Sequence, residues 1–201
     1  MASAFRKLAA MVLAGVFLAA CGNPACAALI AYHESVTGSG VLNGTSFSNS
    51  LITLTGTGDT DNVFTVNSRL ANLVSMSVDV AGVGSATLTG DYYFFGQVHF
   101  GGFSRGIPAS AGSTSVIQIA NSAFTAYDLK SDLGPLPGLR AFAQNTQFAT
   151  GDGGFLQMTS ANNDARFLAQ VTAVPEPSSV AIACVAGVGL LLARKRLGRA
   201  A

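Results

Sequence analysis

The central part of the chain alternates apolar and polar residues with a period of two. In residues 73–80, Val74, Met76, Val78 and Val80 share one side of an extended backbone, and the positions between them are polar. Because successive side chains of a β-strand point to opposite faces, this alternation predicts a strand with one buried face. Similar patterns predict further strands at residues 50–55, 63–67, 86–89, 91–100, 115–119, 123–129, 139–144, 155–159 and 166–174.

Glycine-rich segments separate the predicted strands. The Gly and Asp residues that β-turns favour occur at residues 56–59, 81–84, 101–102 and 151–154. Residues 133–138 combine proline with glycine, which predicts an extended crossover. The rest of the central region lacks the period of an amphipathic helix. About ten short strands at this spacing predict an all-β fold, an antiparallel β-sandwich of jelly-roll-like form.

The N-terminal segment has the composition of an export signal. Arg6 and Lys7 precede an apolar run at residues 8–20, which is followed by small residues. A short positive segment followed by a short apolar segment is typical of a secretory signal peptide. We therefore expect residues 1–27 to direct the chain out of the cytoplasm.

Two processing sites are open at the end of this signal. Cleavage after Ala27 makes Ala28 the first residue of the mature chain, because small residues precede the cut. The alternative is a lipobox at residues 18–21, which makes Cys21 a lipidated N-terminus. Both alternatives predict an exported protein.

The C-terminal segment has the composition of a short membrane anchor. Residues 178–193 contain no charged side chain. As a helix they would span roughly 24 Å, slightly less than the hydrocarbon core of a bilayer. Cations directly after the apolar run predict a cytoplasmic end, which a buried core helix, the alternative, does not explain. They are Arg194, Lys195, Arg196 and Arg199, within a basic tail at residues 194–199.

The strip in front of this anchor contains Pro175, Glu176 and Pro177. Its prolines lack backbone N–H groups and disfavour a helix, so that we expect the strip to be extended and accessible. Strip, apolar helix and basic tail together resemble the PEP-CTERM sorting signal of Gram-negative bacteria. The resemblance implies that an exosortase, a membrane transpeptidase-like enzyme, removes the tail in species that also secrete exopolysaccharide. The chain is then divided into a signal peptide (1–27), an exported β domain (28–173) and a sorting signal (174–201).

Composition excludes one class of partner. Eleven basic and ten acidic residues give the whole chain a formal charge of +1, so we expect no nucleic-acid binding. Residues 28–177 are mildly acidic, with five basic and ten acidic residues. The cysteines fall in the two end segments, so that cleavage after Ala27 would leave a β domain without a disulfide, which a core of this size can manage.

The catalytic motifs in the chain are incomplete. Residues 102–106 match the Gly-x-Ser-x-Gly pattern around Ser104, but a proline follows where a hydrolase needs a helix, and His33 and His99 both precede the serine. Two histidines are too few for an ordinary zinc site. Glu34 is the only glutamate of the β domain, and no pair of acids suggests glycoside hydrolysis. We therefore expect no enzymatic activity.

One turn is a weak candidate for calcium. Asp59, Asp61 and Asn62 place several oxygen ligands close together. Asp and Asn are also common turn residues between strands, which is the alternative interpretation. We expect no other cofactor.

Four consecutive aromatic residues suggest a ligand. Neighbouring strand residues face opposite sides, so either Tyr92 and Phe94 or Tyr93 and Phe95 point outward and can stack on sugar rings. The expected protein is an inner-membrane intermediate that is delivered to the cell surface or extracellular matrix, with a structural or adhesive role among exopolysaccharide. The alternatives are a carbohydrate-binding module of the same matrix and a membrane-anchored lipoprotein with unrecognised activity.

Overall fold

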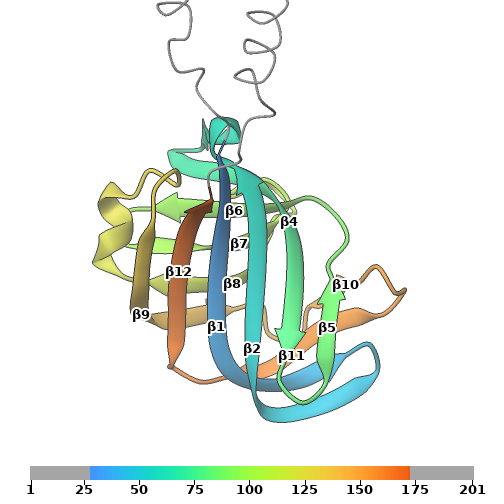
Figure 1. The fold of residues 1–201 in the computed structure, drawn as a ribbon. Coiled ribbons are helices and arrows are strands. Elements are labelled where there is room, and N and C mark those ends of the chain that lie inside the picture. The colour runs from blue at the N-terminus through green and yellow to red at the C-terminus, as the bar shows by residue number, and fades with distance from the viewer. Residues whose placement is uncertain (1–27, 173–201) are drawn as a thin grey trace, which may run out of the picture. The chain divides into compact units, whose positions relative to one another are not determined.

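Antiparallel strands account for most of residues 28–172, the part of the chain that the computed structural model describes (Figure 1). These residues belong to one unit, Ala27–Ala173. The strands are β1 (Leu29–Leu42), β2 (Thr45–Asp59), β3 (Phe64–Val66), β4 (Arg69–Val80), β5 (Gly84–Thr87), β6 (Tyr92–Gln97), β7 (Phe100–Arg105), β8 (Thr114–Ala120), β9 (Leu133–Phe142), β10 (Gln147–Ala149), β11 (Phe155–Ala161) and β12 (Ala165–Thr172). Two short 3-10 helices are η1 (Thr60–Asn62) and η2 (Ser122–Ala126).

Eight of the strands close into a barrel. In order around the ring they are β1, β12, β9, β8, β7, β6, β4 and β2, and all neighbours are antiparallel. The long pairing of β1 with β2 closes the ring. The prediction of an antiparallel all-β fold is therefore confirmed, whereas the jelly-roll-like sandwich is wrong. A barrel of eight strands has an interior just wide enough for side chains to fill it.

The first strand of the barrel is absent from the sequence-based prediction. Its outward and inward residues alternate regularly in burial, as a barrel strand requires. However, its inward positions include Glu34, Gly38 and Gly40. These three residues interrupt the apolar alternation on which the prediction depends. Without β1 the ring cannot close, so the predicted set of strands does not include a complete barrel.

A second unpredicted strand, β7, contains glycines that resemble a turn. The predicted strand at residues 91–100 is in fact β6, a tight reversal and the first residue of β7. A Cβ atom at Gly101 would overlap the ring of Phe124, and one at Gly102 would overlap the carbonyl oxygen of Ile117. These glycines therefore allow close packing within a strand.

The predicted strand at residues 123–129 is wrong, because η2 occupies its first half. The Asn121 side chain accepts a hydrogen bond from the Ala123 amide at 2.9 Å, which caps η2 at its N-terminus. Phe124 of this turn is buried in the core. The predicted crossover at residues 133–138 forms the first part of β9.

Two strands change partners along their length. β1 pairs with β12 from Leu29 to Ser35 and with β11 from Gly38 onward. β4 pairs with β6 near its start and with β5 near its end. A bridge between Leu88 and Thr150 links the segments after β5 and β10. The sheet therefore extends beyond the barrel at the end away from Leu29.

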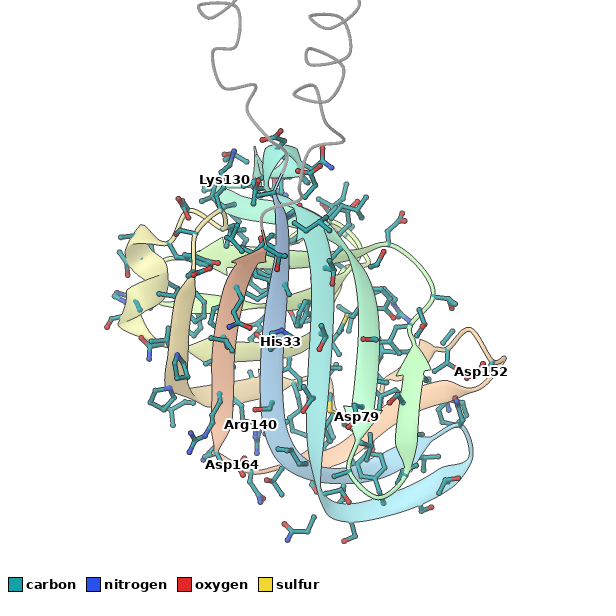
Figure 2. All side chains as sticks on the ribbon, viewed as in Figure 1. His33, Asp79, Lys130, Arg140, Asp152 and Asp164 are labelled. Atoms are coloured by element: carbon teal, nitrogen blue, oxygen red, sulfur yellow. The ribbon has the colours of Figure 1, made fainter. Side chains whose placement is uncertain are left out.

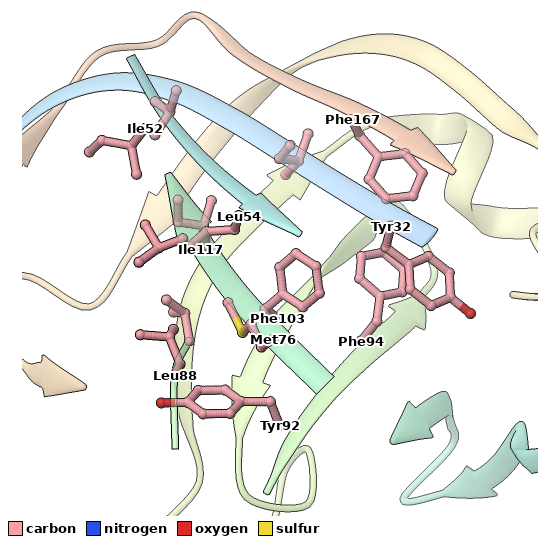
Figure 3. Packing of buried hydrophobic residues seen from close by; sticks show 14 of the residues in the cluster. Tyr32, Ile52, Leu54, Met76, Leu88, Tyr92, Phe94, Phe103, Ile117 and Phe167 are labelled. Atoms are coloured by element: carbon pink, nitrogen blue, oxygen red, sulfur yellow. The ribbon is translucent and has the colours of Figure 1, made fainter. Parts of the chain in front are cut away.

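Aromatic side chains fill the middle of the barrel (Figure 3). The rings of Tyr32 and Phe94 stack with their centroids 4.2 Å apart. Phe94 also contacts the rings of Phe167 at 5.1 Å and Phe103 at 5.3 Å. These four aromatic side chains come from four different strands of the barrel. Their packing therefore joins opposite walls of the barrel.

Both ends of the described chain lie at one rim of the barrel. Leu29 and Thr172 are paired residues on the neighbouring strands β1 and β12. The amide of Thr60 in η1 donates a hydrogen bond to the carbonyl oxygen of Ala28 at 2.9 Å, which holds the first residue of the unit at this rim. The first and last strands of the described unit are therefore neighbours at this rim.

Candidate functional site

The outer face of β1, β2, β4 and β5 carries hydroxyl side chains in register. The outward residues of β2 include Thr53, Thr55 and Thr57, and Ser75 and Ser77 of β4 lie opposite two of them. β1 and β5 add further hydroxyl residues to the same rows. We call this set the hydroxyl face; it comprises Ser35, Thr53, Thr55, Thr57, Ser75, Ser77, Ser85 and Thr87.

Strand geometry makes this array regular. Neighbouring strands lie about 4.8 Å apart, and alternate residues of one strand lie about 6.7 Å apart. The inward residues of β2 hold it against the core: Leu54 is fully buried, and a Cβ atom at Gly56 would overlap the ring of Phe103. Figure 2 shows His33 and Asp79 on the same side of the barrel, on β1 and β4. The hydroxyl groups are thus presented on a wall that packing keeps in place.

A groove of about 440 Å³ lies at the end of the hydroxyl face nearest Leu29. Thr57 and Ser75 of the hydroxyl face line it, together with Leu29 and Leu73. The two leucine side chains are 43% and 48% exposed, respectively. The groove therefore places hydroxyl groups next to accessible apolar surface, a combination that small-molecule and sugar sites use.

The ionisable groups of the groove are carboxylic acids. Asp59 and Asp91 line it, and none of the described lining residues is basic. Asp59 Oδ1 accepts a hydrogen bond from the Asp61 amide at 2.8 Å and so caps η1. Arg166 lies opposite Ser35, at the edge of the hydroxyl face away from the groove. The local charge therefore disfavours an anionic ligand in the groove.

The predicted aromatic pair is only partly available. Tyr92 and Phe94 point into the core and are fully buried, so Tyr93 and Phe95 are the outward residues of β6. Phe95 is nevertheless only 1% exposed, and the Arg69 guanidinium packs over its ring at 5.4 Å. Phe95 is therefore not available for stacking on a sugar ring, and Tyr93 is the one aromatic residue of the predicted pair that remains available.

The remaining ring, Tyr93, adjoins the groove. It lies opposite Leu73, which lines the groove, and Asp91 of the groove precedes β6 by one residue. Phe64 of β3 contacts Tyr93 edge-on, with centroids 6.0 Å apart, and is 38% exposed. The two rings form an apolar margin beside the carboxylates and hydroxyl groups.

The histidines lie apart in different environments. His33 is on the outer side of β1, with Nδ1 3.0 Å from Thr55 Oγ1, and burial lowers its pKa. His99 is in the turn between β6 and β7, with Nδ1 3.2 Å from Thr125 Oγ1. Among residues 28–172, no group of three or more His, Cys, Asp or Glu is arranged to hold a metal ion. Of the calcium candidates Asp59, Asp61 and Asn62, the first is engaged in the cap described above.

The serine of the Gly-x-Ser-x-Gly pattern lies on a strand. Ser104 is 2% exposed in β7, and its hydroxyl donates to the carbonyl oxygen of Gly106 at 3.1 Å. The next regular element is β8 rather than a helix. The structure therefore places Ser104 outside the strand–turn–helix geometry that a nucleophile elbow requires.

An unexpected carboxyl group lies inside the barrel. Glu34 projects inward from β1, and its paired neighbours are Leu54 of β2 and Phe167 of β12. It is fully buried, and neither carboxyl oxygen has a hydrogen-bond partner among the described residues. Burial raises the pKa of Glu34 well above its ordinary value. The nearby Phe103 backbone lowers this pKa, but by less than burial raises it. The folded barrel therefore holds this group protonated at pH values where an exposed glutamate is ionised.

A second set of interior polar groups, on Asn72 and Tyr32, forms hydrogen bonds. The Asn72 amide nitrogen donates to the Tyr32 hydroxyl at 3.1 Å, and that hydroxyl donates to the carbonyl oxygen of Leu129 at 2.7 Å. These bonds join β1 and β4 to the loop before β9. They contribute to the fold and leave the outer hydroxyl face unaffected.

Most predicted processing residues lie outside the described part of the chain. Ala28 is the first described residue, whereas Cys21, Ala27 and residues 175–177 and 194–199 are not described. Within residues 28–172, no helix is long and apolar enough to cross a membrane.

Comparisons with family models, curated proteins and solved structures find no match to this chain.

Proposed function

We propose that this chain is an exported, non-catalytic protein of the cell surface or extracellular matrix, with a structural or adhesive role among exopolysaccharide. In this proposal an exosortase recognises the sorting signal at residues 174–201, holds the chain briefly at the inner membrane and releases the barrel. The observation that carries the proposal is the order of the Pro175–Glu176–Pro177 strip, the apolar run and the basic tail. The apolar run and the cations that follow it suit a short membrane anchor.

The position of the chain ends supports this arrangement. The paired residues Leu29 and Thr172 put both attachment points at one rim. Residues 173–177 span at most about 18 Å when fully extended. An enzyme that cuts at the strip would therefore work close to this rim, and the outer walls of the barrel would remain free for contacts.

Intact mass spectrometry tests the proposal. The protein is purified from cells with a working exosortase and from cells without it, together with a Glu176→Ala variant and a control Asp164→Ala variant in the barrel. We expect loss of the tail near Pro177 only with exosortase, for the natural and control chains. A tail that persists in both strains would overturn the proposal, and a lipid mass on Cys21 would identify the lipoprotein alternative.

A further inference from the structure

One region of the outer wall combines a groove, hydroxyl groups and exposed apolar side chains. We propose that the groove and the adjoining hydroxyl face bind an uncharged polysaccharide chain, with a sugar ring in the groove and the chain continuing across the strands. This inference deepens the proposed function by naming a ligand class and a site, and it rests on that function for the source of the polysaccharide.

The hydroxyl groups provide the polar part of the site. A Ser or Thr hydroxyl both donates and accepts hydrogen bonds, as a sugar hydroxyl does, so the two can pair in either direction. Thr57 and Ser75 are exposed, lie directly opposite each other and both line the groove. Asp59 and Asp91 add carboxylate acceptors at the same end. The hydroxyl face extends this polar surface over four strands, which suits a chain better than a single sugar.

The apolar groups provide the complementary surface. Sugar rings present C–H faces that pack on aromatic and aliphatic side chains. Leu29 and Leu73 line the groove, and Tyr93 lies opposite Leu73. Leu29 and Leu73 are accessible at the surface, whereas other residues fill the barrel core.

The distribution of charge selects the class of polysaccharide. Asp59 and Asp91 would repel uronate or sulfate groups at the groove. Within the hydroxyl face, Asp79 lies opposite Thr53 and accepts a hydrogen bond from the Ser85 hydroxyl at 2.6 Å, so a third carboxylate would repel an anionic chain there. Burial lowers the pKa of the neighbouring His33, which disfavours a positive charge at this position. A long uncharged chain can form hydrogen bonds with the hydroxyl groups of both the groove and the hydroxyl face, whereas a polycation would pair only with the few carboxylates among them.

Binding is tested by affinity electrophoresis of the full chain in a polyoxyethylene detergent, which contains no sugar. Native gels contain dextran, hydroxyethylcellulose, alginate, chitosan or the exopolysaccharide of the producing cells. The test variant, Thr57→Val with Ser75→Ala, removes two groove hydroxyl groups with little change in shape. The matched control, Thr45→Val with Ser46→Ala, changes exposed residues at the far end of the same strand, β2. Equal urea midpoints establish that both variants are folded.

We expect an uncharged polysaccharide to retard the natural and control proteins, and alginate to have no effect. The test variant should bind at least about tenfold more weakly, the loss expected from two hydrogen bonds. Equal binding by the test variant, binding to alginate or chitosan alone, or no binding to any polysaccharide of the panel would overturn the inference. Tail removal, measured by mass in the same strains, tests the proposed function separately, so the two failures are distinguishable.

Discussion

The buried carboxyl group of Glu34 makes the stability of the barrel depend on pH. The group is fully buried, and its oxygens have no hydrogen-bond partner among the described residues. Burial raises its pKa well above the ordinary value, while the Phe103 backbone acts in the opposite direction. We predict that Glu34→Gln, which keeps the shape and cannot ionise, makes the barrel less sensitive to rising pH.

The sign and size of this effect follow from proton linkage. In the unfolded chain Glu34 releases its proton near pH 4.3, as other glutamates do. At higher pH the folded state therefore binds one more proton than the unfolded state, and the free energy of unfolding falls as the pH rises. The fall is about 1.4 kcal/mol per pH unit and continues until the pH reaches the raised pKa of the folded state. The natural protein should therefore lose stability relative to Glu34→Gln as the pH rises above about 4.3, and the difference should stop growing at the raised pKa.

Urea unfolding at several pH values between 4 and 8 measures this difference. Near-UV circular dichroism of tyrosine is a suitable signal, because all four tyrosines lie within the described residues 28–172 and three of them are buried. Asp61→Asn removes an exposed acid and serves as the control, and Glu34→Leu is a second variant without a buried polar group. If natural protein and Glu34→Gln show the same pH dependence, Glu34 is ionised in the folded state and our account of the interior is wrong.

Two further predictions concern the wall and the rim of the barrel. Tyr92→Ala should lower the free energy of unfolding by about 3–5 kcal/mol because its ring is fully buried in the core, whereas Tyr93→Ala on the outer side should cost much less; urea midpoints compare the two. Partial burial acts to raise the pKa of Asp128, but hydrogen bonds from the Lys130 amide and from the Ser131 hydroxyl and amide lower it overall. The stabilisation is therefore present above the pKa of the unfolded chain and is lost as the pH falls through the lowered value. Asp128→Asn should lower the Tm at pH 7, and this decrease should become smaller as the pH is lowered below about 4. An equal decrease at every pH would contradict this explanation.

The sequence predicts the strands that have one apolar face and fails where inward residues are small or polar. Residues 73–80 lie within β4 because Val74, Met76, Val78 and Val80 all face the core. The same pattern does not predict β1, because glycines and Glu34 occupy some of its inward positions. Buried and exposed residues alternate along β1, but apolar and polar residues do not. Pairing between strands distant in sequence decides that the sheet closes, and a single sequence contains little information about it.

In the candidate site, some neighbouring residues are close in sequence, and others are brought together only by strand pairing. Thr53 and Thr55 lie in the strand that the sequence predicts at residues 50–55. The turn predicted at residues 56–59 is wrong, because these residues, Thr57 among them, continue β2. That Ser75 and Ser77 lie opposite them, and that Leu29 and Asp91 border the same groove, follows only from the register of the barrel. The site is therefore assembled by the same long-range pairings that the sequence leaves open.

The inward face of β2 packs against the core, and its outward face carries residues of the proposed binding site. Leu54 and Gly56 face inward, where one is fully buried and the other leaves room for the ring of Phe103. Thr57 faces outward, is exposed and lines the groove, so the core does not need its hydroxyl group. Replacing it by valine should therefore change binding with little effect on stability, because exposed substitutions away from buried features usually stay within about 0.5 kcal/mol. A larger side chain at Gly56 should do the reverse: it would displace β2 from the core and weaken the barrel before any ligand is present.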